Sequence, residues 1–463
     1  VSRLLNALGA IGVASPKALL SVLAGLAAVL TSGGLAAAHH VAAAMTVRKM
    51  VGAGAALSSA ADICPSLVAT AVDPLSDWAY GASQRGSPID DDAVLEIARA
   101  MAAAYSCLDA EAQERHLGPL FDRHAETARK PASASDANSR LLPLFSAAVC
   151  ACRPQTRLPV DDPGQFLGEL AAAALATDRP IHRDACLEII AAAINKAPSA
   201  AQRSQLAAPV LQCAAAATGP AATTLRQWVA RALVSCNDKV GYECVRWLLA
   251  QITDDSAHAV AAADGFSTIL CSHDWAVAPA THGVFKVLAK QRFYAVVVPE
   301  ITSSFRSAQS DTVRANLLVA LTHTVRHMPK SVLMNGIESV VPLLLSAIRL
   351  TAGSLKAASI RTISMVALET PDTLKDDVTA SVIPLLLAAL AQASAANTVE
   401  VRCAALDALA LLPERYAFTV LHTARKDVLA ALARARDDRK RVVRVDAVRA
   451  YNKWLAFGDI QAA

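Results

Sequence analysis

The sequence predicts an all-α fold, an α-solenoid of HEAT/armadillo-type helical repeats. The first observation is periodicity, because similar helical starts recur about every 42 residues through the second half of the chain. The second is composition: 54% of the residues are hydrophobic and only 4% are aromatic, which suits close-packed, alanine-rich helices better than strands. The third is length, because a single core stops growing near ~250–300 residues, whereas a solenoid adds core with every repeat.

Two series of positions carry the period. Similar residues surround four basic positions that are 42, 46 and 42 residues apart, namely Arg314, Lys356, Arg402 and Arg444. A second series has a proline in an apolar run at intervals of 43 and 42 residues, namely Val298-Pro299, Val341-Pro342 and Ile383-Pro384. Two helices in every ~40–47 residues is the spacing of HEAT and armadillo repeats.

Three stretches are expected along the chain. Residues 1–128 are predicted to be irregular helical repeats of the same solenoid, because turn residues break the alanine-rich runs. Residues 129–164 are predicted to be an irregular loop or internal link, because small polar residues and prolines replace the apolar period. Residues 165–463 are predicted to be a C-terminal HEAT-repeat domain. In the first stretch, Asp90, Asp91 and Asp92 are placed to cap a helix over residues 93–107.

The start of the chain indicates a fragment. It opens on Val1 rather than methionine, so we expect a piece of a longer protein, and no signal peptide is recognisable. The longest apolar run near the start, residues 18–30, has 13 residues, fewer than the ~20 that span a bilayer. We therefore expect a soluble intracellular protein that does not contact a membrane.

No pattern indicates catalysis, a metal or a cofactor. The ten cysteines lie among alanine and leucine, so we interpret them as reduced, and the closest pair, Cys150 and Cys152, fits a buried helix end better than a zinc site. His323 and His327 are four residues apart, but the glutamate and third ligand of a zinc site are missing. Phosphate-binding and nucleophile-elbow motifs are absent from the sequence. An enzyme is therefore the least favoured class.

The last clear repeat occupies residues 437–454. Read as a helix, it places Asp437 and Asp438 where an N-cap side chain would accept amide protons, and Val442, Val445 and Val448 share one face.

Positive charge is concentrated here. Residues 425–453 hold ten Lys or Arg and four Asp, a net charge of +6, while the whole chain carries +4. This segment is either the solvated outer face of a terminal repeat or a docking surface for an acidic partner; nucleic acid is less favoured, because no aromatic residues interleave the charges.

Individual basic residues also allow two interpretations. Arg402 and Arg444 either pair with acidic residues of neighbouring repeats, which holds the repeat register, or bind a ligand. Gln291-Arg292-Phe293-Tyr294 places a charge beside two aromatic residues, and core packing of Phe293 is favoured over a functional role.

The second half of the chain resembles a known family. It is similar to the C-terminal half of the large HEAT-repeat scaffold of the cytosolic iron-sulfur protein assembly targeting complex, historically named as a DNA-repair and transcription factor. The resemblance covers about residues 257–457 and extends weakly to about residue 180. It rests on these residues, in order: Ala261-Ala262-Ala263-Asp264-Gly265-Phe266-Ser267, Lys290-Gln291-Arg292-Phe293-Tyr294, Val298-Pro299, His323, Pro329-Lys330-Ser331-Val332-Leu333, Val341-Pro342-Leu343-Leu344-Leu345 and the 437–454 block, with Asn195-Lys196-Ala197-Pro198 and Trp228-Val229-Ala230-Arg231-Ala232-Leu233 in the weak part.

The resemblance implies a non-enzymatic adaptor in the cytoplasm and nucleus. Its implied partners are a DUF59-type assembly factor, a WD40 propeller protein, and iron-sulfur apo-proteins such as DNA helicases, polymerases and primase; direct binding of nucleic acid is not implied. We expect the last three or four repeats to dock the assembly factor. The expected partner-binding residues are Arg292, Lys330, Arg402, Lys440, Arg441 and Arg444.

The repeat period alone also fits another class. A HEAT-repeat transport or trafficking adaptor that recognises linear signals or a small GTPase has the same pattern. Affinity purification separates the two, because a propeller and a DUF59 partner support the first class and a GTPase or coat subunits support the second.

Overall fold

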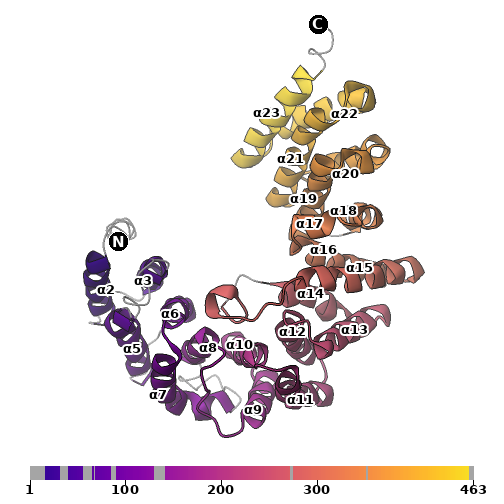
Figure 1. Cartoon of the computed structure of the whole chain (residues 1–463). Coiled ribbons are helices and arrows are strands. Elements are labelled where there is room, and N and C mark those ends of the chain that lie inside the picture. Colours follow the sequence, from indigo (N-terminus) through magenta and orange to yellow (C-terminus); the bar gives the residue numbers. More distant parts are fainter. Residues whose placement is uncertain are drawn as a thin grey trace. The chain divides into compact units, whose positions relative to one another are not determined.

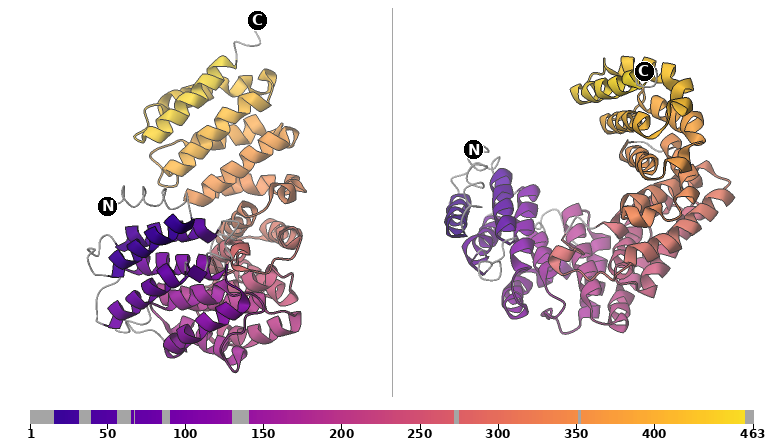
Figure 2. Two further views of the ribbon diagram at one scale, coloured as in Figure 1. Left: turned by 60° about the vertical axis from the view of Figure 1, so that its left-hand side comes forward. Right: turned by 45° about the horizontal axis from the view of Figure 1, so that its top comes forward.

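The computed structural model describes residues 16–31, 40–55, 65–66, 68–84, 90–129, 141–271, 275–350 and 353–457. In these ranges all regular secondary structure is helical, and successive helices stack side by side in two layers (Figures 1 and 2). The predicted α-solenoid is therefore confirmed. Within the same ranges, no helix combines the length and apolar character that crossing a bilayer requires.

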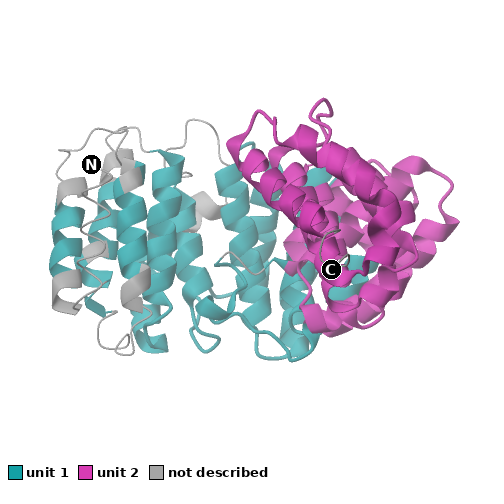
Figure 3. Cartoon of the chain, turned by 90° about the horizontal axis from the view of Figure 1, so that it is seen from above, with its two compact units in different colours: residues 1–246, 271–289 teal, residues 247–270, 290–463 magenta. Residues whose placement is uncertain are grey.

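The chain divides into two compact units (Figure 3). Unit 1 comprises Val1–Arg246 and Cys271–Ala289, and unit 2 comprises Trp247–Leu270 and Lys290–Ala463. This division differs from the three predicted stretches. In addition, a fully buried helix, α8 (Leu142–Ala151), lies inside the 129–164 segment that was predicted to be a link.

Unit 1 is built from α-helical hairpins. In one layer α6, α8, α10 and α12 pack in succession, and in the other α7, α9 and α11 do so. The bounds of its helices are α2 (Pro16–Thr31), α3 (His40–Ala55), π-helix η2 (Val68–Val72), α5 (Asp73–Gln84), α6 (Asp91–Tyr105), α7 (Ala110–Arg129), α8, α9 (Pro163–Ala176), α10 (Pro180–Lys196), α11 (Ala200–Ala216), α12 (Pro220–Val234) and the 3-10 turn η4 (Pro279–Thr281), and α13 (Lys239–Thr253) spans the boundary between the units.

Unit 2 continues the same plan. Helices α19, α21 and α23 pack in succession in one layer, and α20 and α22 lie in the other. Its helices are α14 (Ala259–Leu270), α15 (Ala289–Ser307), α16 (Asp311–Arg326), α17 (Lys330–Met334), α18 (Val341–Leu350), α19 (Gly353–Glu369), α20 (Ile383–Ala389), α21 (Val399–Arg415), α22 (Phe418–Ala435) and α23 (Arg441–Ala456), with the short turns η5 (Ile337–Ser339), η6 (Pro371–Leu374) and η7 (Val378–Val382).

The structure explains the two periodic series. The basic positions Arg314, Lys356, Arg402 and Arg444 lie in α16, α19, α21 and α23, whereas Pro299, Pro342 and Pro384 lie in α15, α18 and α20. Each series therefore marks alternate helices of the hairpins. The period predicted from the sequence is confirmed.

Helix starts follow ordinary capping chemistry. The Asp90 side chain accepts a hydrogen bond from the Asp92 amide at 2.8 Å and caps α6, as predicted. Ser199 caps α11 and Thr398 caps α21 through their hydroxyl oxygens. The cap predicted for the last helix is wrong: the N-cap of α23 is Lys440, and Asp438 lies two residues earlier, where it serves another contact described below.

The cysteine pair behaves as the buried helix end that the sequence favoured. Cys150 and Cys152 are 0% and 5% exposed, and Cys152 is the C-cap residue of α8. The Lys196 ammonium, itself buried, donates hydrogen bonds to the carbonyl oxygens of both residues. These contacts satisfy the orphan carbonyls at the end of α8 and join α8 to α10.

Candidate docking surface

A buried ion pair links two consecutive repeats at the end of unit 2. The Arg402 Nε lies 2.8 Å from Asp438 Oδ2, and Arg402 NH2 lies 3.3 Å from Oδ1. Another guanidinium N–H donates to the Asn397 carbonyl at 2.6 Å. Asp438 is 2% exposed and also accepts the Lys440 amide proton at 2.8 Å. This bidentate, desolvated pair fixes α21 against the loop that leads into α23.

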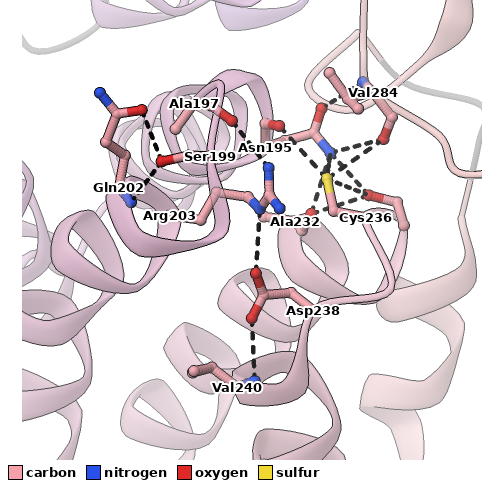
Figure 4. Close-up of polar contacts among 11 residues, drawn as sticks. Asn195, Ala197, Ser199, Gln202, Arg203, Ala232, Cys236, Asp238, Val240 and Val284 are labelled. Carbon is pink, nitrogen blue, oxygen red and sulfur yellow. Dashed lines mark hydrogen bonds and ion pairs between the residues drawn. The ribbon is translucent and has the colours of Figure 1, made fainter.

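The same arrangement occurs in unit 1, where Figure 4 shows it. Arg203 of α11 donates to the Ala197 carbonyl at 3.0 Å and pairs with Asp238 at 3.2 Å. Asp238 in turn accepts the Val240 amide proton at 3.2 Å, at the start of α13. An arginine near the start of one helix therefore binds a carboxylate at the entrance to the next helix of its layer. We call this arrangement a rung.

Arg444 of α23 repeats half of the rung. Its guanidinium donates to the Asp438 carbonyl at 2.7 Å, as Arg402 does to Asn397 and Arg203 does to Ala197. In the part of the chain that the structure describes, however, no carboxylate pairs with Arg444, and α23 is the last helix. The carboxylate half of this rung is therefore unfilled among the described residues, as it also is at Arg183 of α10, which donates to the Thr177 carbonyl at 2.6 Å.

The face of α23 beside Arg444 is apolar and exposed. Val442, Val445 and Val448 share one face, as their spacing indicates, but their exposed fractions are 61%, 60% and 45%. The packed face of α23 is a different one, made by the fully buried residues Val443, Ala447, Ala450 and Trp454. Exposed valines at helical spacing form a contiguous apolar stripe, and such stripes mark contact sites.

Cations border this stripe. Arg439, Lys440 and Arg441 are exposed, and among the described residues their side chains make no hydrogen bond or ion pair. Other basic residues of the segment are used internally: Arg449 pairs with Asp407, and Lys453 with Glu414. We call Lys440, Arg441, Val442, Arg444, Val445 and Val448 the α23 surface.

The other expected partner-binding residues, Arg402, Lys330 and Arg292, lie on three different helices. Arg402 has only 10% of its side chain exposed and is engaged in its rung, which is the register-holding alternative. Lys330 opens α17 and pairs with Glu369 at 2.6 Å. Arg292 is exposed near the start of α15, while Phe293 beside it is fully buried. Lys440, Arg441 and Arg444 lie together at the start of α23, and the buried Arg402 adjoins them through Asp438, whereas Lys330 and Arg292 lie on other helices.

Catalytic chemistry finds little support in the described residues. Burial raises the pKa of the Cys152 thiol to about 11 and that of Cys244 to about 12, so these sulfurs stay protonated and unreactive near neutrality. Within the described ranges, no group of three or more His, Cys, Asp or Glu side chains is arranged to hold a metal.

One set of contacts was missed by sequence reasoning. The Asn195 carboxamide, 0% exposed, bonds the backbone of Val284, which lies 89 residues further along the chain (Figure 4). Asn195 entered the sequence analysis only as part of the resemblance. A contact between residues so far apart leaves no periodic signal, so spacing rules could not find it.

Comparisons with known proteins agree on one family. The family model described as "RNAPII transcription regulator C-terminal", MMS19_C, matches residues 13–413. The "MMS19 nucleotide excision repair protein homolog" of Bos taurus and that of Homo sapiens are each 29% identical over 331 residues, which is 70% of this chain. The "DNA repair/transcription protein mms19" of Schizosaccharomyces pombe is 31% identical over 239 residues, which is 50% of this chain and 22% of that protein.

These comparisons also have bounds. The matched region is 31% of the Bos taurus and Homo sapiens proteins, so the chain spans about a third of the length of those relatives. The family match ends at residue 413, before α22 and α23. Among solved structures, karyopherin Kap121p bound to RanGTP superposes with a TM-score of 0.50 at 14% identity, covering 98% of this chain and 45% of that chain, which shows a shared solenoid fold.

Proposed function

This chain belongs to the MMS19 family, whose members are named as DNA repair and transcription proteins, and from that premise we propose that it is a non-catalytic scaffold of the cytosolic iron-sulfur protein assembly targeting complex. In this role it joins a DUF59-type assembly factor and a WD40 propeller protein to apo-proteins such as DNA helicases, polymerases and primase. It acts in the cytoplasm and nucleus, and without direct contact to nucleic acid or membrane.

The observation that carries the proposal is the α23 surface. Its apolar stripe has the exposure of an unfinished interface, since Val442 and Val445 are 61% and 60% exposed. Covering a valine contributes ~1.5–3 kcal/mol at full burial, and these three are already about half covered, so the stripe contributes roughly 2.5–5 kcal/mol to an interface. The cations Lys440 and Arg441 at its edge then select among partners that fit the stripe.

The open rung supports an acidic partner. Arg402 and Arg203 each hold a carboxylate that stands at the entrance to a helix. Arg444 presents the same guanidinium at the same place in its helix. The occupant that completes this pattern carries an aspartate or glutamate next to apolar side chains. An assembly factor with an acidic segment has this composition, and we assign it to the α23 surface.

The mechanism is avidity. A scaffold that holds a cluster carrier and its client at the same time raises the effective concentration of one near the other to the mM range, with no chemistry of its own. The solenoid supplies a long surface for this purpose, because each repeat adds area without changing the others.

The test is a binding measurement with the purified DUF59-type assembly factor. The double variant Lys440→Glu/Arg441→Glu should weaken binding at least about tenfold at 0.1 M salt, because two attractive charges become repulsive. The matched control is Lys426→Glu/Arg434→Glu, which makes the same change in charge on exposed positions of α22. Equal affinity of the wild type and the Lys440/Arg441 variant would defeat the placement on α23.

Affinity purification of the wild-type chain tests the class of function. Recovery of a propeller protein and a DUF59 protein supports the assembly scaffold. Recovery of a small GTPase or coat subunits in their place supports the transport or trafficking adaptor. The likeness to a karyopherin fold, at 14% identity, favours neither class.

A further inference from the structure

A segment of unit 1 that is irregular apart from the short 3-10 turn η4 crosses the ends of several helices of one layer. Residues 275–288, which we call the strap, connect α14 to α15. The His282 Nε2 lies 2.6 Å from the carbonyl oxygen of Ser106, just after α6. The Lys286 amide donates to the carbonyl of Ser235, just after α12, at 2.8 Å. The strap therefore touches repeats that are not neighbours in the solenoid.

The first half of the strap is anchored in the core. Ala276, Val277 and Ala278 are 0%, 1% and 5% exposed, and Ala276 packs in a cluster with Cys150 of α8 and Ala192 of α10. The indole N–H of Trp275 donates to the Glu188 carboxylate at 3.0 Å. This half behaves as part of the fold.

The second half is held differently. Phe285, Val287 and Leu288 are 39%, 86% and 64% exposed, although all three are large and apolar. The segment is bounded by two non-glycine residues in the left-handed region, His282 with φ 61° and Leu288 with φ 67°. Side chains other than glycine rarely adopt this region, and residues held in it are strained. Residues 283–287 therefore form a segment that is half-buried at Gly283 and Val284, exposed from Phe285 to Val287, and bounded by two strained residues.

The side chain of Asn195 binds this segment through the segment's backbone. The Val284 amide donates to Asn195 Oδ1 at 2.7 Å, and Asn195 Nδ2 donates to the Val284 carbonyl at 3.0 Å. Nδ2 also donates to Ser235 Oγ at 2.7 Å, which orients the carboxamide. One carboxamide thus satisfies both polar groups of one residue, and the next-but-one amide, that of Lys286, bonds Ser235. Alternate residues bonded along one edge are how an extended peptide is recognised.

Space remains beside the strap. A cavity of about 1540 Å³ is lined by Trp275, Thr281 and His282 of the strap and by residues of α6 and α10 such as Arg99 and Glu188. It lies within unit 1, on the side of the strap formed by residues up to His282.

We propose that residues 283–287 are an internal ligand that occupies a peptide-binding seat on unit 1, and that a partner segment exchanges with them. The segment swings out at His282 and Leu288 while Trp275 and Ala276 stay anchored. The occupant is an unstructured stretch of a partner protein that lays an extended backbone with a small apolar residue on Asn195. This surface is separate from the α23 surface, which lies in unit 2.

The chemistry of the seat sets the partner's requirements. Because Asn195 is fully buried and its bonds to the strap go to the backbone amide and carbonyl of Val284, an occupant needs a free amide N–H and C=O at that point. Proline or an N-methylated residue there is excluded. The half-buried Val284 side chain leaves room for a residue of about valine size.

The test uses a fluorescein-labelled synthetic peptide with the sequence of residues 280–287 and measures its binding by anisotropy. In Val284→Pro the strap loses the N–H that Asn195 accepts, so the seat becomes available and the peptide should bind at least about tenfold more tightly than to the wild type. The control is Val287→Pro, in the turn closed by the Ala289 amide and the Lys286 carbonyl, where proline at the second position fits. It should bind the peptide as the wild type does.

Two further probes decide the result. A peptide with N-methylvaline at the Val284 position should not bind the Val284→Pro variant. The proposal is overturned if the methylated and unmethylated peptides bind this variant with equal affinity. It is also overturned if the unmethylated peptide binds the variant and the wild type with equal affinity. If the Val284→Pro variant does not fold, amide hydrogen exchange of the wild-type chain tests the proposal in its place. The Val284 and Lys286 amides should exchange at least about tenfold faster than core amides of α10 and α12. Protection equal to that of α10 means that the segment does not leave its seat and also overturns the proposal.

Discussion

The rung between Arg402 and Asp438 makes a quantitative prediction about stability. In Arg402→Met the apolar stem is kept but the guanidinium is lost, so the Asp438 carboxylate, 2% exposed, keeps only the Lys440 amide among its described partners. Breaking a buried pair on one side costs about 3–5 kcal/mol, because a desolvated charge is left without its counter-ion. The exposed pair of Arg449 and Asp407, with side chains 51% and 59% exposed, contributes only ~0–1 kcal/mol.

The assay is urea unfolding combined with hydrogen exchange, which reads the amides of α21 and α23 separately, because repeats of a solenoid can open locally. Arg402→Met should lower the free energy of opening there by about 3–5 kcal/mol and Arg449→Met by ~0–1 kcal/mol. Adding Asp438→Asn to Arg402→Met should restore much of the loss, because the buried charge is removed while the acceptor for the Lys440 amide stays. If Arg402→Met costs no more than Arg449→Met, the rung does not stabilise the solenoid and the reasoning fails.

Three other predictions follow from single residues. Leu288→Gly should raise the melting temperature slightly. The change relieves about 1–2 kcal/mol of left-handed strain, which exceeds the ~0.5–1 kcal/mol entropic cost of glycine, and the lost side chain is 64% exposed. An unchanged or lower melting temperature contradicts this prediction. Gly241→Ala should destabilise unit 1 by ~1–3 kcal/mol in urea unfolding, since its Cβ would meet the Leu233 Cβ and the Val234 nitrogen at 2.8 Å; a neutral result would mean that α12 and α13 separate easily. Burial raises the pKa of the Cys152 thiol to about 11, so the thiol ionises at lower pH in the unfolded chain than in the folded one. Its contribution to the free energy of unfolding should therefore be complete below pH 9 and be lost as the pH rises to about 11. Cys152→Ala should flatten this part of the plot of stability against pH.

The sequence carried the repeat because a repeat is a local, periodic pattern. Arg402 and Arg444 could be recognised as equivalent, and pairing across repeats could be expected for them, since every repeat meets the same neighbour in the same way. The residue that pairs with Arg402 could not be predicted from the sequence, because the distance of Asp438 from the next helix is that of an N-cap residue. The structure shows that its carboxylate faces Arg402.

Periodicity also does not predict which face of a helix packs against its neighbours. Val442, Val445 and Val448 share a face, but the residues that pack are Val443, Ala447, Ala450 and Trp454, which include two alanines that carry little hydrophobic signal. The choice between the two faces depends on the neighbouring helices, not on the helix itself. The contacts of the strap are harder still, since the bond from His282 to Ser106 spans 176 residues.

The rung and the strap lead to one view of how this solenoid would bind other proteins under the two proposals. In each described rung an arginine is satisfied by a carboxylate that a later helix brings, as Asp238 does for Arg203 and Asp438 does for Arg402. Asn195 is satisfied in another way, by an irregular segment that returns from 89 residues away. Arg444 is a position where the described chain supplies neither, and Arg183 of α10, which donates to the Thr177 carbonyl, also has no carboxylate partner among the described residues. A repeat protein that completes its own polar contacts with the next repeat needs only to leave one contact incomplete, or fill it with a replaceable segment, to create a binding site. Partner recognition then reuses the interactions that already hold the fold together.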